Sequence, residues 1–481
     1  MVGMAGQATG GADGQATGGA DGRHTVAGFA PWPPQGDGKR RGKALREKAP
    51  RAAHGRFELP VDRPEVADAV AEANLGRLTH LVPIRVGRMA ASPFAFLRGS
   101  AGLMACDLAV TPASGVAAQL CGDAHAANFG LYGDARGRLV IDINDFDETV
   151  PGPWEWDLKR LVASLVLAGR QAGAGEDVCR QAAFDAAASY RRTMRRLAKL
   201  SALDAWNAIA DDHLVAFADA HELADVLASV GEKALRNTSA RFAAKSTVRD
   251  EEGGWRFTAA PPVLSEVTEP EATAVAGSLA GYLDSVAPEL RPLLARYSVQ
   301  DVAFRIVGTG SVGTRAYVVL LTDRREQPLV LQVKEARPSV LLPHLVRAGF
   351  PVGGAPMHEG QRVVLGQRRI QVVSDVLMGW TTVDGLPYQV RQFRNRKGSV
   401  DPAALRPEQL DDYGRLTGAL LARAHSHTAD AAEIAGYCGR SEELDEAMAA
   451  FAVAYADRSE ADHAALLAAV RAGRLPAETG V

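Results

Sequence analysis

Cysteine is scarce in this chain, and neither positive nor negative charge dominates it. The four cysteines lie far apart with no CxxC pair, so we expect reduced thiols in a cytoplasmic protein rather than a disulfide framework. A formal net charge of −3 gives no global signal for nucleic acid or for a membrane surface. No apolar run approaches the roughly 18–20 residues of a membrane span, and the N-terminus lacks the pattern of a secretion signal.

Residues 1–38 lack the apolar side chains from which a core is built. The segment GQATGGAD occurs at residues 6–13 and again at residues 14–21. Such low-complexity sequence cannot offset its ordering entropy, so we expect disorder. The basic run over residues 39–56 is interpreted as a solvated tail, with order beginning near Arg56. A phosphate-contacting arm is the alternative for this run.

The rest of the chain predicts an α+β protein, because helical periodicity alternates with β-rich runs. Helices are expected over residues 158–200, 204–241, 272–297, 407–427 and 441–474, and strands over residues 302–307, 316–321, 328–333, 375–382 and 387–393. We expect a helical lobe over residues 39–300, a β-rich lobe over residues 301–400, and a helical segment over residues 401–481 that completes the first lobe. About a hundred residues is a common size for a folded unit such as this β-rich lobe.

A polar loop, GDAHAAN at residues 122–128, places Asp123 five positions before Asn128. A predicted hairpin over residues 129–140 then leads to Asp145 and Asp147. Phosphoryl transfer needs a carboxylate near the acceptor hydroxyl and oxygen ligands for Mg²⁺. We therefore predict that Asp123 is the catalytic carboxylate and that Asn128, Asp145 and Asp147 hold the metal.

Two other interpretations of this region were weighed. A cluster of Asp, Asn and Gly is also typical of ordinary loops. His125, Asp142 and Asp145 could instead form a metal-hydrolase centre, but no second histidine lies nearby to complete a transition-metal site.

A second motif, GTGSVG, provides Gly308, Gly310, Ser311 and Gly313. A dinucleotide-binding fold would place a helix after it, whereas β-branched and aromatic residues predict a strand here. A third predicted strand ends at Lys334, which gives the strand order of protein kinases. The glycines would let backbone amides approach the phosphates of ATP, and Lys334 would contact the α- and β-phosphates. A solvent-facing strand end is the alternative for Lys334.

The first motif resembles the catalytic loop of the aminoglycoside and choline kinase group, whose pattern is HGDxHxxN followed by IDW or DFG. Cys121 replaces the leading histidine, while Asp123, His125 and Asn128 fall on matching positions. The resemblance adds His125 to the candidate catalytic residues. It also likens the Asp-Phe-Asp sequence at residues 145–147 to the metal-binding turn.

A third match lies downstream, where residues 152–158 resemble the GDPxxDLA element of the same kinases. The spacing of this element favours Asp145 over Asp142 as the metal ligand. By the same resemblance, Asp157 would be a structural acid that ties the catalytic loop to the next helix.

The Gly-rich motif follows the catalytic loop by roughly 180 positions, the reverse of the order in ordinary kinases. The resemblance therefore implies a circularly permuted, two-lobed kinase-like fold, which is physically allowed because contacts define a fold. The helix over residues 410–427 would replace the one that leads into the catalytic loop.

From about residue 42 the chain also resembles the bacterial family named domain of unknown function 2252, through the segments RMAASPFAFLRG, CGDAHAANFG, NDFDETVPGPWEWDLKRL, VGTGSVGTR, LQVKEA, VRQF and LARAHSH.

These motifs together predict an ATP- and Mg²⁺-dependent phosphotransferase with an unknown small-molecule or protein acceptor. A catalytically silent nucleotide-binding regulator (a pseudokinase) is one alternative, and an AMP transferase that binds ATP reversed is another. Glu359 is the nearest candidate for the acid that pairs with Lys334, and Glu335 is a poorer one.

Overall fold

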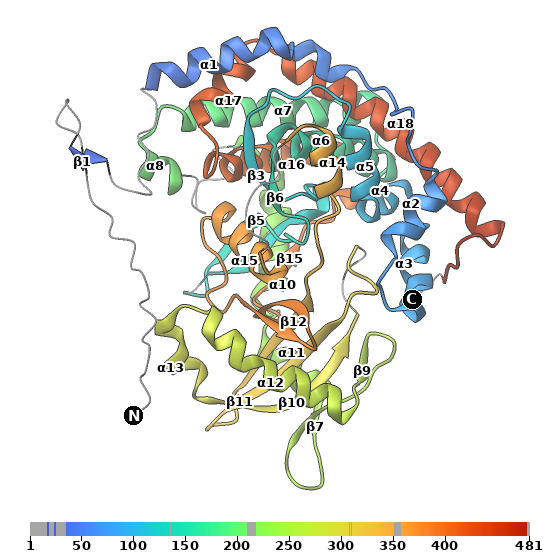
Figure 1. Ribbon diagram of the computed structural model, residues 1–481, viewed down its shortest axis with the longest axis vertical. Coiled ribbons are helices and arrows are strands. Elements are labelled where there is room, and N and C mark those ends of the chain that lie inside the picture. The colour runs from blue at the N-terminus through green and yellow to red at the C-terminus, as the bar shows by residue number, and fades with distance from the viewer. Residues whose placement is uncertain are drawn as a thin grey trace, which may run out of the picture.

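The computed structural model describes residues 17–18, 24–25, 35–134, 136–208, 218–306, 308, 310–350 and 357–478. Helices pack together at one end of the molecule and a six-stranded antiparallel sheet lies at the other, so the chain is α+β as expected (Figure 1). Apart from the short strands β1 (Thr17–Gly18) and β2 (His24–Thr25), residues 1–34 lie outside the described part, and so does the disorder expected for them. The disorder expected for residues 35–38 is wrong, because they begin a helix.

The helical end includes two long, largely buried helices, α6 (Trp154–Gln171) and α16 (Pro407–Ser426). Its other principal helices are α7 (Glu176–Leu197), α17 (Ala431–Cys438) and α18 (Glu443–Arg471). Helix α6 is buried over nearly its whole length, which suits its largely apolar sequence. Gly414 and Gly418, one turn apart on α16, let that helix approach α7 closely. A Cβ atom at Gly418 would lie 2.1 Å from the carbonyl oxygen of Ala186.

Helix α1 (Gln35–Lys48) packs against α17, which corrects the interpretation of the basic run. Arg41 pairs with Asp430 and Glu433 at 3.0 and 3.2 Å, and Arg46 donates to the carbonyl oxygen of Tyr437 at 2.8 Å. The solvated-tail interpretation and a start of order near Arg56 are therefore wrong. These cations find their partners on a helix almost four hundred positions later, which local composition does not reveal.

The sheet has the strand order β13-β14-β12-β11-β10-β9. Its strands are β9 (Leu264–Glu266), β10 (Tyr297–Arg305), β11 (Ala316–Asp323), β12 (Pro328–Glu335), β13 (Gly379–Val383) and β14 (Leu386–Gln392), and five of them match the strands predicted from sequence. Alternate residues of β11 enter different cores, as a strand requires. Val319 packs with α12 (Glu269–Ser285), whereas Val318 packs with the cluster beneath α11 (Ser239–Ser246). The helices that pack on the sheet, α11 and α12, thus precede residue 301, where the β-rich lobe was expected to begin.

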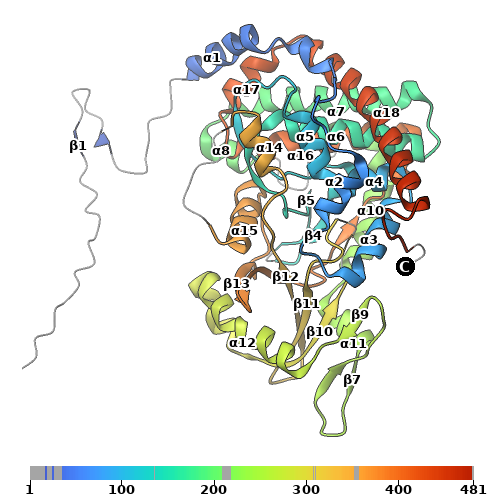
Figure 2. The ribbon, with the colours of Figure 1, turned by 45° about the vertical axis from the view of Figure 1, so that its right-hand side comes forward.

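The remaining elements are short, and they lie at both ends and between them (Figure 1). They are α2 (Val66–Ala73), α3 (Val82–Met89), α4 (Pro93–Gly99), α5 (Ala101–Leu108), β3 (Ala117–Leu120), β4 (Phe129–Gly133), β5 (Leu139–Ile143), β6 (Val150–Pro153), α8 (Ala202–Trp206), α10 (Ala224–Leu235), β7 (Thr247–Arg249), β8 (Trp255–Phe257), α13 (Arg291–Leu294), α14 (Leu342–Arg347), α15 (Glu359–Ile370) and β15 (Gly398–Ser399). The hairpin predicted after the polar loop is confirmed as β4 and β5. Helices α2–α4 lie beside the Gly-rich hairpin (Figure 2), where Ile84 packs on Val312.

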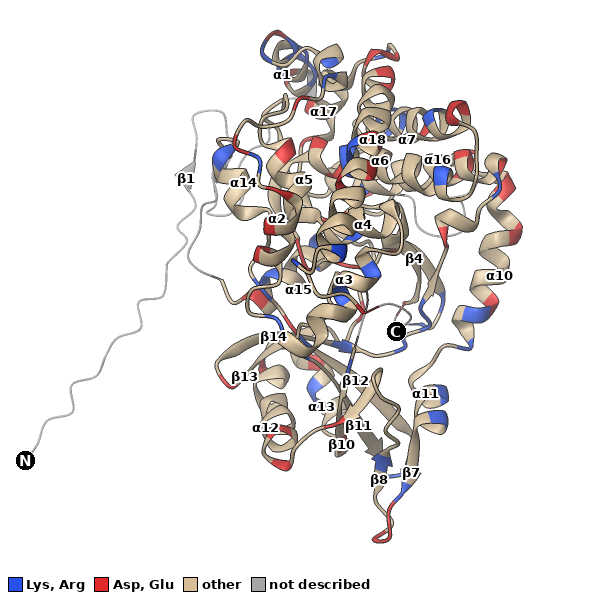
Figure 3. Cartoon of the chain, turned by 90° about the vertical axis from the view of Figure 1, so that its right-hand side faces the viewer, with Lys and Arg blue, Asp and Glu red and all other residues tan. Residues whose placement is uncertain are grey.

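The charged residues are spread over both ends of the molecule. Lys and Arg as well as Asp and Glu occur on the helices and around the sheet (Figure 3). Among the described helices, none is both long and apolar enough to traverse a lipid bilayer.

We predict that Gly42→Ala weakens the docking of α1. The new Cβ atom would lie 1.9 Å from the carbonyl oxygen of Glu433, and overpacking of this kind costs about 1–3 kcal/mol. Gly277→Ala on exposed α12 is the control, because a Cβ atom there meets open space and Ala favours a helix by up to about 1 kcal/mol. Urea unfolding of both variants gives the two free energies. Equal stability of the two variants would contradict the docking.

Candidate functional site

A cavity of about 490 Å³ lies between the helical end and the sheet. The sequence-predicted residues that line it are Asp123, His125, Asn128, Asp145, Asp147, Gly308, Gly310 and Ser311. Two motifs far apart in the chain therefore face one space. Gly313 and Lys334 are not among the residues that line the cavity. The carbonyl oxygen of Gly313 accepts a hydrogen bond from the amide of Leu78 at 2.8 Å.

One face of α6 holds the polar loop over residues 121–128. The carboxylate of Asp157 accepts hydrogen bonds from the amides of Cys121 and Gly122 at 2.8 and 3.1 Å. The hydroxyl of Ser164 accepts one from the amide of Ala126 at 2.8 Å. This confirms that Asp157 is a structural acid that ties the loop to the helix.

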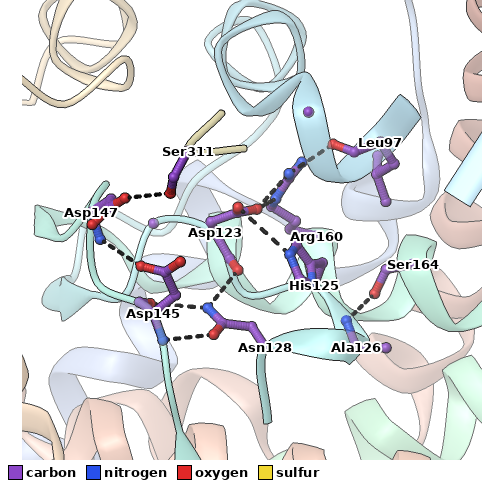
Figure 4. A network of polar contacts seen from close by, with 12 residues as sticks. Leu97, Asp123, His125, Ala126, Asn128, Asp145, Asp147, Arg160, Ser164 and Ser311 are labelled. Atoms are coloured by element: carbon purple, nitrogen blue, oxygen red, sulfur yellow. Dashed lines mark hydrogen bonds and ion pairs between the residues drawn. The ribbon is translucent and has the colours of Figure 1, made fainter. Parts of the chain in front are cut away.

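Asp123 is fixed by an arginine that the sequence analysis did not single out. Arg160 Nε donates to Asp123 Oδ1 at 2.6 Å (Figure 4). Since Asp157, Arg160 and Ser164 are spaced by three and four positions, they share one face of α6. That periodicity was the available signal for Arg160. The second carboxylate oxygen, Oδ2, lies 3.7 Å from Nε2 of His125.

His125 is neutral at physiological pH. Burial lowers the pKa of its imidazole to about 4, against the opposing charge of Asp123, and the nearby Arg98 and Arg160 contribute to the lowering. Its Nδ1 atom is buried without a hydrogen-bond partner among the described residues. The ring therefore acts as an uncharged neighbour of Asp123.

Asn128 joins the catalytic loop to the metal-binding turn expected at residues 145–147. Its Oδ1 accepts a hydrogen bond from the amide of Asp145 at 2.7 Å, and its Nδ2 donates to the carbonyl oxygens of Asp123 and Asp145, both at 3.0 Å (Figure 4). Both polar atoms of the side chain thus contact backbone. Asn128 therefore holds the backbone of Asp145 next to the backbone of Asp123.

Lys334 reaches this turn from the end of β12. Its Nζ pairs with the carboxylate of Asp147 and lies 3.8 Å from Oδ1 of Asp145. Asp147 also accepts hydrogen bonds from Ser311 at 3.0 Å and from Gln389 at 2.9 Å. The side chain of Lys334 is only 3% exposed, so the solvent-facing alternative for it is wrong.

Asp145 is the acid of the turn that remains most open to the cavity. Its side chain keeps 50% exposure, against 28% for Asp147. Partial desolvation in the cavity raises the pKa of Asp145, but the positive charges of Lys334 and Arg391 outweigh this effect, so the pKa is lowered overall. Asp145 is therefore a carboxylate with an oxygen available to a ligand.

Neither glutamate expected to pair with Lys334 does so. Glu335 pairs with Arg315, because successive side chains of β12 point to opposite faces. Glu359, at the start of α15, pairs with Arg362 of the same helix. Lys334 instead takes its acids from the metal-binding turn.

Arg362 connects α15 to that turn and was not found from the sequence. Its guanidinium donates to the carbonyl oxygens of Thr149, Asp147 and Arg337 at 2.7, 2.8 and 2.8 Å. This helix of the sheet end therefore holds the backbone at Asp147 and Thr149 through two hydrogen bonds, and the third joins it to the segment after β12. No local pattern identifies such a set of carbonyl partners.

Asp142 lies outside the cavity. It is completely buried and pairs with Arg423 on α16, which makes it a structural residue. Within the described residues, no group of three His, Cys, Asp or Glu side chains is arranged to hold a metal ion. The metal-hydrolase interpretation therefore has no support in this geometry.

The chain belongs to the family described as an uncharacterized protein conserved in bacteria, DUF2252, whose model matches residues 77–469. This confirms the family resemblance of the sequence segments. No curated protein and no solved structure matches the chain.

We predict that Asp157→Ala lowers the free energy of unfolding by at least about 2 kcal/mol. The substitution leaves the buried amides of Cys121 and Gly122 without an acceptor, and each such group costs about 1–3 kcal/mol. Glu232→Ala on the exposed side of α10 is the control, with an expected change within about 0.5 kcal/mol. Urea titration measures both variants, and indistinguishable values would show that Asp157 does not hold the loop.

Proposed function

We propose that this protein is an ATP- and Mg²⁺-dependent phosphotransferase with a circularly permuted protein-kinase-like fold. Its acceptor is a hydroxyl group of a small molecule or a protein. The observation that carries the proposal is the meeting of Lys334, from the strand after the Gly-rich hairpin, with Asp145 and Asp147 at the cavity that also contains Asp123. Two separate motifs that share one chemistry converge there.

The arrangement of elements supports the same proposal. The Gly-rich segment joins β10 to β11, Lys334 ends the adjacent β12, and α15 packs on β13 and β14. Helix α16 follows the sheet in sequence but lies beside the catalytic loop, where His425 contacts Asp157 at 3.3 Å. A permuted chain can produce these kinase-like neighbours because contacts, and not chain order, define a fold.

The residues present fit a magnesium–nucleotide complex. Mg²⁺ is usually held by one or two carboxylates together with substrate phosphates, so a cage of three acids is not required. Asp145 has the most open carboxylate of the turn and would be its ligand, with Asp147 behind it. The bound metal would neutralise charge on the phosphates during transfer. Asn128 would act by holding Asp145 in place.

Side chains of the protein would then bind the phosphates and orient the acceptor. Lys334 would donate to the phosphates from a position that Asp147 already fixes. Arg160 occupies Oδ1 of Asp123, which leaves Oδ2 to orient the acceptor hydroxyl or to accept its proton. His125 would support that oxygen as a neutral neighbour.

A nucleotide-binding regulator is the second candidate. The observation that favours it is the ion pair between Asp123 and Arg160, which engages the carboxylate expected to act as the base. Transfer of AMP, with ATP bound in the reverse direction, is a further variant of the enzyme. Parallel incubation with γ-labelled and α-labelled ATP in Mg²⁺ separates phosphate transfer, AMP transfer and no transfer.

We predict that Mg·ATP raises the thermal stability of the protein and that Asp145→Ala abolishes most of this effect. A ligand at a hundredfold excess over its Kd stabilises by about 2.7 kcal/mol. The melting temperature with and without millimolar Mg·ATP is the measurement, and Asp177→Ala on exposed α7 is the control. A parent protein whose melting temperature does not respond to Mg·ATP has no competent nucleotide site.

We predict that Asp123→Asn separates turnover from binding. Asp123 would touch the acceptor and not the nucleotide, so Mg·ATP affinity should stay nearly unchanged. Turnover should fall by roughly 10²–10⁴-fold, the usual contribution of a general base. Calorimetric titration and consumption of labelled ATP provide the two readouts. Undiminished turnover in this variant would remove Asp123 from the mechanism.

A further inference from the structure

The arginine at the end of α4 stands out among the residues of the cavity. Arg98 lines the cavity, and its Nε atom is buried without a hydrogen-bond partner. In the described part of the chain its guanidinium has no ion pair, and its closest aromatic contact is Phe94, with 6.0 Å between Cζ and the ring centroid. Buried donors are nearly always satisfied in folded proteins. Arg98 as a whole is half-buried and lines the cavity, so a ligand there would meet the terminal nitrogens of its guanidinium.

The backbone on both sides of Arg98 is held by other arginines. Arg160 donates to the carbonyl oxygen of Leu97 at 2.8 Å, and Arg85 donates to that of Gly99 at 2.7 Å. Arg85 is 2% exposed, so its own position is fixed by packing. Arg98 is therefore an unpaired charge on a braced backbone. Functional side chains need this kind of support from a second layer of residues.

The surroundings of Arg98 show which ligand atoms it faces. A Cβ atom built at Gly310, the middle glycine of the Gly-rich segment, would lie 3.7 Å from the carbonyl oxygen of Arg98. On the other side, Arg160 donates hydrogen bonds both to the carbonyl oxygen of Leu97 on α4 and to the carboxylate of Asp123 (Figure 4). The charge of Arg98 also contributes to the lowered pKa of His125. Arg98 thus lies between the Gly-rich segment and the catalytic loop. A group that passes from nucleotide to acceptor must occupy that space.

We propose that Arg98 binds the terminal phosphate of ATP and stabilises its charge during transfer. This inference rests on the proposed function and adds a catalytic residue that belongs to neither motif. In the step, the acceptor oxygen forms a bond to the γ-phosphorus, and the bond from that phosphorus to the bridging oxygen of ADP breaks. The electron pair of the broken bond leaves with ADP, and the acceptor proton goes to Asp123. Arg98 donates hydrogen bonds to the non-bridging oxygens throughout.

The test compares nucleotides that differ only in the terminal phosphate. Binding of ADP and of the imido analogue of ATP, both with Mg²⁺, is measured by calorimetric titration of the parent and of Arg98→Ala. A hydrogen bond to a charged group is worth about 1.5–3 kcal/mol, so the analogue should bind roughly 10- to 150-fold more weakly to the variant. Affinity for ADP should not change.

Two further variants make the result specific. Arg192→Ala, on the exposed side of α7, controls for the loss of one positive charge and should bind both nucleotides as the parent does. Arg98→Lys keeps the charge and should recover part of the affinity for the analogue. Melting curves report whether each variant is folded.

The outcomes separate this inference from the function on which it rests. A parent that binds neither nucleotide overturns both. A parent that binds both nucleotides, with an Arg98→Ala variant that loses affinity for each equally or for neither, overturns the role of Arg98 alone. Selective loss of the imido analogue supports the assignment.

Discussion

The site depends on one buried carboxylate that accepts hydrogen bonds from backbone amides. Asp157 lies at the start of α6 and takes the amides of Cys121 and Gly122, while His425 contacts it from α16. Because α6 is buried along most of its length, the helix cannot shift without disturbing the core. The loop over residues 121–128 is therefore held to this helix by hydrogen bonds from its backbone amides. The position of Asp123 in this loop therefore depends on the contacts that Asp157 and Arg160 of α6 make with it.

Charge compensation explains how so many ionisable groups coexist at the cavity. Lys334 neutralises Asp147 and faces Asp145, and Arg160 neutralises Asp123. The pair between Lys334 and Asp147 also links the sheet to the helical end, whereas the pair between Arg160 and Asp123 lies within the helical end. Isolated charges at such depth would be costly, and the pairing removes much of that cost. Arg98 differs, because it is half-buried and has no ion pair among the described residues.

Permutation is consistent with this physical picture. Helix α16 lies beside the catalytic loop although it follows the sheet in the chain. Its glycines allow close contact with α7 at Ala182 and Ala186, and that contact does not depend on where the chain begins. The docking of α1 on α17 likewise joins segments from opposite ends of the sequence.

The sequence by itself determined the α+β class and strands β10–β12, because these follow from local periodicity. The resemblance of its motifs to known families also gave the family and the structural role of Asp157. It also identified three of the acids that line the cavity, Asp123, Asp145 and Asp147. Only the tertiary structure decided that Lys334 pairs with Asp147 instead of Glu359, and that Arg160 engages Asp123. The reason is that partner choice depends on which segments meet in space. The alternation of side chains along β12 determines which face of the sheet Lys334 points to. Only the packed fold determines which carboxylate lies close enough to pair with it.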